Sequence, residues 1–161
     1  MEITIRKIKD NYPYNLLLQA DETHESINKY LFDSAVYEVL LPEREEPVGV
    51  FCLYQVDTTT IELKNIAVDE PFRGMGTGSV VLARAVEIAA TDGYREMIIG
   101  TGTEDCAPAL VRFYERNGFH KSGVRENFFV DNFPEPIYEN GVQLKDMLIL
   151  SRDIEKYRKP V

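Results

Sequence analysis

The sequence predicts an α/β protein with one mixed, mostly antiparallel sheet and helices on both faces. Three strand-like segments follow one another across residues 34–68, separated by charged or polar turns, which is typical of an antiparallel meander. A glycine-rich turn then leads directly into a long apolar helix. A further strand, helix and strand follow, so a crossover connection extends the sheet. We expect the 161 residues to form a single domain, 1–161.

The spacing of apolar residues predicts the elements of the N-terminal half. Apolar and polar residues alternate over residues 3–8 and indicate a first strand. The pattern over residues 12–31 is helical but broken near residues 21–25, where Asp21 and Thr23 are candidate caps for the second piece. Further strands are expected over residues 34–41, 48–56 and 61–68.

The C-terminal half continues the alternation of helices and strands. A buried helix is expected over residues 79–91, closed by Gly93. The remaining predicted elements are strands over residues 95–100, 119–124 and 143–151 and a helix over residues 108–117. Residues 127–141, rich in aromatics, prolines and acids, are expected to form a loop.

Composition excludes several classes of function. The net charge of −9, from 27 acidic and 18 basic residues, opposes non-specific nucleic-acid binding. The sequence contains no apolar run of membrane-spanning length, and residues 1–6 lack a signal-peptide core, so we expect a cytoplasmic protein with no membrane partner. Cys52 and Cys106 have no metal-ligand residues near them in the sequence, which predicts reduced thiols and no structural metal.

The turn at residues 73–78, Arg-Gly-Met-Gly-Thr-Gly, carries the most information. A strand that turns through glycines into a helix leaves backbone N–H groups unpaired at the positive end of the helix dipole. Glycine lacks a Cβ, so an anion can approach the backbone closely. The turn lacks the lysine of a P-loop and the glycine spacing of a dinucleotide fingerprint. The sequence therefore predicts a phosphate or pyrophosphate site of another kind.

Two motifs together identify a family resemblance. Arg73, Gly76 and Gly78 fit an Arg/Gln-x-x-Gly-x-Gly/Ala pattern, and residues 109–119, Ala-Leu-Val-Arg-Phe-Tyr-Glu-Arg-Asn-Gly-Phe, end in Tyr-x-x-x-Gly-Phe. In this order and spacing they resemble the two coenzyme-binding motifs of the GCN5-related N-acetyltransferase (GNAT) family. The resemblance covers residues 34–124 closely and the whole chain loosely.

The resemblance implies a fold, a co-substrate and a set of contacts. In the family, two neighbouring parallel strands splay apart and hold the pantetheine arm of acetyl-CoA, so acetyl-CoA or coenzyme A is the expected co-substrate and no metal is needed. The acetyl group would pass directly to an amine of a small molecule or a peptide. By resemblance, pantetheine would lie against Ile66, Ala67 and Val68, and the pyrophosphate against Arg73, Gly74, Met75, Gly76, Thr77, Gly78 and Ser79.

Tyr114 and Glu62 are the catalytic residues that the resemblance implies. Tyr114 is similar to the family's tyrosine acid, which protonates the leaving thiolate; the alternative is a tyrosine packed in the core. Glu62 lies where relatives keep a glutamate base, and either this residue or water would take the proton of the amine. By strand alternation Glu62 shares a face with Lys64, Ile66 and Val68, so it lies either in the cleft or on the outer surface.

The sequence departs from the family pattern before the second motif. An asparagine that contacts coenzyme A in relatives is absent from residues 103–108, and Asp105 is predicted to cap the following helix instead. Cys106 is expected to be a small buried residue and not a nucleophile, because neither His24 nor His120 has a visible orienting partner.

Residues 127–141 resemble a subgroup of bacterial acetyltransferases of unassigned substrate, which carry Pro-Glu-Pro-Ile-aromatic-Glu-Asn-Gly here. Glu135 or Glu139 is a candidate to meet a cationic amine, and the alternatives are a packed surface loop or a homodimer contact. Weaker candidates for the acceptor side are Asp21, Glu22 and His24.

Two functions of other classes compete with an enzyme. One is a non-catalytic acyl-CoA-binding regulatory module on the same fold. The other is a structural module that binds an anion at the glycine-rich turn without any coenzyme. The presence of both Tyr114 and Glu62 favours the enzyme.

Overall fold

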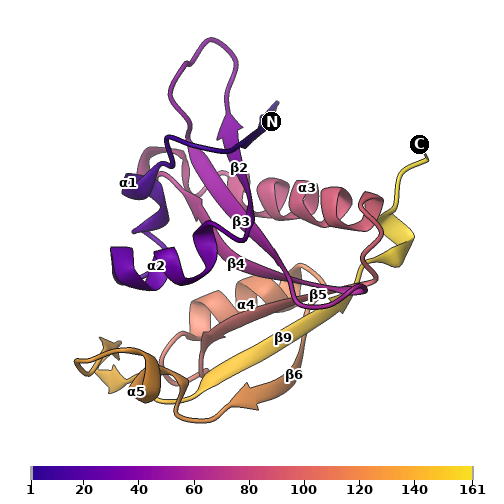
Figure 1. Cartoon of the computed structure of the whole chain (residues 1–161). Helices are drawn as coiled ribbons and strands as arrows, with labels where there is room; N and C mark the ends of the chain where they lie inside the picture. The colour runs from indigo at the N-terminus through magenta and orange to yellow at the C-terminus, as the bar shows by residue number, and fades with distance from the viewer. Residues whose placement is uncertain (1, 161) are drawn as a thin grey trace.

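The computed structural model describes residues 2–160 and has a seven-stranded sheet in the order β1-β2-β3-β4-β5-β9-β6, with a separate two-stranded hairpin, β7-β8 (Figure 1). The strands are β1 Thr4–Ile8, β2 Ala35–Leu40, β3 Gly49–Gln55, β4 Thr60–Val68, β5 Glu96–Gly102, β6 His120–Arg125, β7 Tyr138–Glu139, β8 Val142–Gln143 and β9 Met147–Asp153. The α-helices are α1 Tyr14–Leu17, α2 His24–Leu31, α3 Thr77–Thr91, α4 Pro108–Arg116 and α5 Phe128–Asn132, and short 3₁₀ turns cover Glu70–Phe72 and Glu155–Tyr157.

Helices cover both faces of the sheet, as predicted. On one face α1 and α2 bury Leu17, Ile27 and Leu31 against Val50 of β3. On the other face, α3 and α4 form a larger core with apolar residues from all the central strands. The central strands provide apolar side chains to both faces of the sheet, because successive side chains of a strand point to opposite sides.

Several predicted boundaries are confirmed and three are wrong. The Thr23 side chain accepts a hydrogen bond from the Ser26 amide at 3.0 Å and caps α2. Asp105 does not cap α4: a turn on the Thr103 carbonyl makes Ala107 the N-cap residue, and the Thr103 hydroxyl engages the Asp105 carboxylate.

The other two corrections concern the region after β6. Residues 127–141 are not only loop, because they contain α5 and the first strand of the β7–β8 hairpin. The last strand begins at Met147 and not at residue 143, since Gln143 pairs within the hairpin. It also lies between β5 and β6 in the sheet.

The neighbouring parallel strands β4 and β5 diverge. They pair only from Thr60–Glu96 to Glu62–Ile98, although both strands continue beyond these residues. Over the remainder of β4 the backbone pairs with β3 alone, which leaves the edge towards β5 without ladder partners. The splayed pair of the predicted fold is therefore present.

A β-bulge in β4 overturns the predicted facing of Glu62. Cys52 pairs with Asn65 and Leu53 pairs with Leu63, so Lys64 is an extra residue in the ladder. The extra residue inverts the alternation. Glu62 and Lys64 therefore face the α1–α2 side together with Asn65, and not together with Ile66 and Val68 as simple alternation predicts.

Candidate active site

A cleft opens where β4 and β5 diverge, and we call it the strand cleft. Its volume is about 460 Å³. Its walls come from residues 63–68 of β4, Ile99 and Gly100 of β5, Tyr114 of α4 and the chain between α1 and α2, residues 18–22. The unpaired edge of β4 thus offers backbone donors and acceptors along a groove that is open to an extended ligand.

The glycine-rich turn leaves open space in front of α3. Gly74 and Gly76 have φ angles of 81° and 75°, which L-residues with side chains rarely adopt. A Cβ added to either glycine would meet no atom within 4 Å, so the space before them is empty. Gly76 is the N-cap residue of the 15-residue helix α3 and supplies no side-chain cap. This arrangement suits an anion at the positive end of the helix.

Internal hydrogen bonds fix both ends of this turn. Arg73 Nε donates to the Val68 carbonyl at 2.8 Å, and its terminal nitrogen donates to the side chain of Gln19. Asn117 Nδ2 donates to Ser79 Oγ at 3.2 Å, which joins the start of α3 to the end of α4. The turn is therefore held against β4 and α4 by the chain's own side chains. The exposed side chain of Met75 points away from the core.

Tyr114 lines the strand cleft from α4 and is 4% exposed. Its ring makes edge-on contacts with Phe113 and Phe119, at centroid distances of 5.2 and 5.8 Å. Burial raises the pKa of Tyr114 well above the usual value for a phenol. The hydroxyl therefore stays protonated at neutral pH, which is the form that a proton donor requires.

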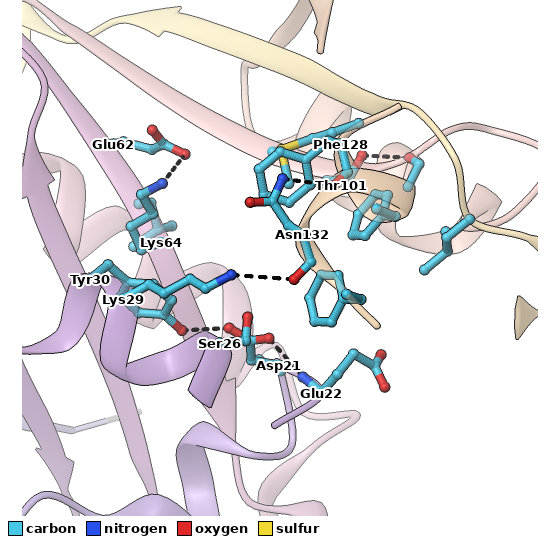
Figure 2. A pocket seen from close by; sticks show the side chains of 18 of the residues that line it. Asp21, Glu22, Ser26, Lys29, Tyr30, Glu62, Lys64, Thr101, Phe128 and Asn132 are labelled. Carbon is cyan, nitrogen blue, oxygen red and sulfur yellow. Dashed lines mark hydrogen bonds and ion pairs between the residues drawn. The ribbon is translucent and has the colours of Figure 1, made fainter. Parts of the chain in front are cut away.

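Glu62 is buried at the point where β4 and β5 stop pairing, and two cations hold its carboxylate. Arg125 Nη2 lies 3.1 Å from Oε1 and Arg125 Nη1 lies 3.5 Å from Oε2. Lys64 Nζ lies 3.2 Å from Oε2 (Figure 2). Both oxygens of Glu62 therefore have charged partners within the chain.

A second cavity adjoins the strand cleft, and we call it the aromatic pocket (Figure 2). Its volume is about 360 Å³, and it lies between β4 with α2 on one side and α5 on the other. The rings that line it are Tyr30, Tyr54, Phe128, Phe129 and Phe133. Lys29 Nζ on α2 donates to the Asn132 carbonyl at the end of α5, at 3.2 Å, and ties the two walls together.

Three carboxylates lie at the junction of the strand cleft and the aromatic pocket, because Asp21, Glu22 and Glu139 line both. Asp21 accepts hydrogen bonds from the Tyr30 hydroxyl at 2.9 Å and from the Glu22 amide at 2.7 Å. Neither Glu22 nor Glu139 has an ion-pair partner within residues 2–160. Burial raises the pKa of Glu139, and the negative charge of Glu22 raises it further.

The raised pKa of Glu139 predicts a pH-dependent effect on stability. The charged form is disfavoured in the folded protein, so its cost is present above the unfolded-state pKa and vanishes where the carboxyl is protonated in both states. We expect Glu139→Gln to be more stable than the wild type at pH 7 by less than about 1 kcal/mol, since solvent screens this partly exposed group. Urea unfolding at several pH values tests this. A difference that grows as the pH falls towards about 4 would contradict the account.

The structure places the remaining candidates outside the two cavities. Cys52 and Cys106 are buried free thiols, and burial raises the pKa of Cys52 to about 12. Glu135 is exposed and lines neither cavity. His24 is also exposed and stacks on the ring of Tyr14 at 4.6 Å.

Residues 2–160 include no group of three or more His, Cys, Asp or Glu side chains arranged to bind a metal ion. No helix in this part of the chain is long and apolar enough to span a membrane.

Sequence reasoning missed the partners of Glu62 and the tie formed by Lys29. Lys64 is two residues from Glu62 in the same strand, so the alternation of side chains was a usable signal for this pair. Arg125 lies 63 positions away on β6, and no local pattern links it to Glu62. Neither does any local pattern link Lys29 to the Asn132 carbonyl, 103 positions away.

Comparison with known proteins identifies the family of the chain. The model of the Acetyltransferase (GNAT) family matches residues 4–119. The chain is 32% identical over 141 residues, 88% of each protein, to the uncharacterized N-acetyltransferase YvbK of Bacillus subtilis.

Solved structures agree as well. A GNAT family acetyltransferase from Elizabethkingia anophelis with acetyl-CoA bound is 37% identical, with a TM-score of 0.87 over 94% of this chain and 97% of that one. A Bacillus subtilis acetyltransferase in complex with CoA is 30% identical, with a TM-score of 0.84 over 94% of this chain and 99% of that one. The protein is an N-acetyltransferase that takes acetyl-CoA as its acyl donor, and the chain belongs to the Acetyltransferase (GNAT) family.

Proposed function

We propose that the protein transfers the acetyl group of acetyl-CoA directly to the amine of a small molecule, which enters through the aromatic pocket. The observation that carries this proposal is the junction of two cavities. The strand cleft accommodates an extended donor, and the aromatic pocket meets it beside unpaired carboxylates. A cationic amine is attracted to such a junction. The pocket is bounded by α5 and the hairpin, which favours a small acceptor over a peptide.

We propose that the donor is held by the backbone more than by charged side chains. The amides of the turn, from Gly74 to Ser79, would bind the pyrophosphate, with Arg73 fixing the turn. Pantetheine would lie along the edge of β4 at Ile66, Ala67 and Val68 that does not pair with β5, where the Val68 carbonyl already accepts from Arg73 Nε. A backbone N–H there would also polarise the acetyl carbonyl as negative charge develops on its oxygen.

The reaction needs no nucleophilic side chain. The neutral nitrogen of the amine attacks the thioester carbonyl, a C–N bond forms and the C–S bond breaks. We propose that Tyr114 gives its proton to the departing sulfur. The raised pKa of Tyr114 makes it a weak acid, so the proton moves only as negative charge builds up on the sulfur.

The nitrogen must also lose a proton. Glu62 is the predicted base, but its two oxygens already have partners within the chain, Lys64 and Arg125, with which an amine would have to compete. We therefore propose that water at the open junction takes the proton and that Glu62 fixes the pocket wall. The role of Glu62 as the base stays a prediction, and the variant Glu62→Gln tests it directly.

We expect Glu62→Gln to lower kcat/KM roughly tenfold, because Lys64 and Arg125 lose their counter-charge next to the reacting groups. The acidic limb of the pH profile of kcat/KM should persist in this variant. Steady-state rates between pH 5 and 9 measure both quantities. If the acidic limb disappears, Glu62 is the base and the water route is wrong.

The broad test of the function is thiol release from acetyl-CoA by the purified protein with amines of several classes. We expect transfer to at least one small-molecule amine, with N-acetyl product detected by mass spectrometry. Thermal stabilisation by acetyl-CoA, and none by ATP or NAD, separates the enzyme from a module that binds any anion. Stabilisation without transfer to any amine would favour the non-catalytic acyl-CoA-binding module.

A further inference from the structure

We propose that the acceptor is a primary amine with a single positive charge and an apolar or aromatic body. Its ammonium group would lie between Glu22 and Glu139, and its body against the rings of the α5 side of the aromatic pocket (Figure 2). This inference rests on the proposed function and names the class of substrate. Most polar groups of the pocket already have partners, and the few that do not indicate what a ligand must supply.

Most polar side chains that line the aromatic pocket already have partners within the chain. The carboxylate of Glu62 is neutralised by Lys64 and Arg125. Lys29 Nζ donates to the Asn132 carbonyl, and the Thr101 hydroxyl donates to the Gly102 carbonyl at 2.7 Å. A ligand that formed hydrogen bonds with these groups would first have to break their existing ones. The net gain in binding free energy would therefore be small.

Among residues 2–160, Glu22 and Glu139 are the charged side chains of the pocket that have neither an ion-pair partner nor a side-chain hydrogen bond. They belong to different segments, the connection between α1 and α2 and the β7–β8 hairpin, and they meet where the pocket joins the strand cleft. Two like charges near each other are stabilised when a cation lies between them. The nitrogen that attacks the thioester must occupy this junction. Lys64 also lines both cavities, but its charge is paired with Glu62, so the reacting ammonium group is the cation that would lie between Glu22 and Glu139.

The α5 side of the aromatic pocket is apolar. Phe128, Phe129 and Phe133 are half-buried and contact one another, at centroid distances of 5.2 and 6.1 Å. Leu144 and Met147 continue this wall. Removing an apolar body from water there is favourable in proportion to the apolar area that is buried.

The same charges reject two other classes of amine. A second ammonium group, as in a polyamine, would lie near Lys29, which lines the aromatic pocket but not the strand cleft and repels it. A carboxylate next to the amine, as in an amino acid, would lie against Glu22 and Glu139. Both penalties act on binding of the acceptor and not on binding of acetyl-CoA.

The test compares three amines at saturating acetyl-CoA: 2-phenylethylamine, spermidine and phenylalanine. We expect kcat/KM for 2-phenylethylamine to be at least about threefold higher than for the other two, as one like-charge contact with an exposed charged group predicts. Equal or higher kcat/KM for spermidine or phenylalanine overturns the proposal. So does the absence of transfer to 2-phenylethylamine.

Variants connect the preference to the named residues. Glu139→Gln should lower kcat/KM for 2-phenylethylamine about two- to fivefold, whereas Glu135→Gln, in the same loop but outside both cavities, should not change it. Phe129→Leu should lower kcat/KM for 2-phenylethylamine more than for methylamine, which is too short to reach the ring. Equal effects of the Glu139 and Glu135 variants would overturn the placement of the ammonium group.

The outcomes also separate this inference from the proposed function. Thermal stabilisation by acetyl-CoA, measured for every variant, shows that the fold and the donor site are intact. If the protein acetylates spermidine or phenylalanine but not 2-phenylethylamine, the acceptor class is wrong and the proposed function stands. If no amine of any class is acetylated, the proposed function itself fails.

Discussion

Tyr114→Phe is expected to lower kcat by roughly 100-fold and to leave the Kd for acetyl-CoA within about twofold of the wild type. The substitution removes only the hydroxyl, and the ring contacts of Tyr114 with Phe113 and Phe119 remain. The leaving sulfur then departs as a bare thiolate without a proton from Tyr114, which raises the barrier. Single-turnover thiol release gives the rate of the chemical step, and calorimetry gives the affinity.

A matched control uses a tyrosine outside the strand cleft. Tyr37 is also buried in the core beside an aromatic ring, 4.9 Å from Phe51, but it lies on β2 and lines neither the strand cleft nor the aromatic pocket. Tyr37→Phe should therefore leave kcat unchanged. An unchanged kcat for Tyr114→Phe would remove the assigned proton donor, whereas a large rise in Kd would make Tyr114 a binding residue.

Gly76→Ala is expected to weaken coenzyme A binding by roughly 10- to 100-fold. Gly76 has a φ of 75°, so alanine strains the backbone by about 1 kcal/mol or more. Its methyl group would also occupy the empty space before α3, where we place the pyrophosphate. Loss of one or two hydrogen bonds to a charged group, at about 1.5–3 kcal/mol each, accounts for the expected change. Titration calorimetry with coenzyme A measures it.

Gly93 provides the control at the other end of the same helix. Its φ of 104° imposes a similar backbone strain on alanine, but it follows the C-terminus of α3 and lies far from the turn. Gly93→Ala should therefore lose stability without losing affinity for coenzyme A. Equal losses of affinity in both variants would mean that destabilisation, and not the obstructed turn, causes the effect.

Local signals in the sequence were sufficient for most of the fold. The spacing of apolar residues predicted the central strands and the helices α2, α3 and α4, and Thr23 marked the start of α2. The glycines of the turn predicted positive φ angles at Gly74 and Gly76. These features depend on neighbouring residues, and a single sequence contains that information.

The parts that sequence reasoning missed depend on contacts between distant segments. The bulge at Lys64 arises from the pairing of β3 with β4, and it alone decides which face Glu62 occupies. Arg125 reaches Glu62 only because β6 lies in the same sheet, two strands away from β5. Likewise, the meeting of Glu22 with Glu139 requires the hairpin to fold over the cleft.

The most direct test of the central claim is a crystal structure of the protein with coenzyme A. The account predicts the diphosphate on the backbone amides between Gly74 and Ser79, pantetheine along the free edge of β4, and the sulfur within about 3.5 Å of the Tyr114 hydroxyl. Coenzyme A bound elsewhere, or a sulfur far from Tyr114, would contradict it.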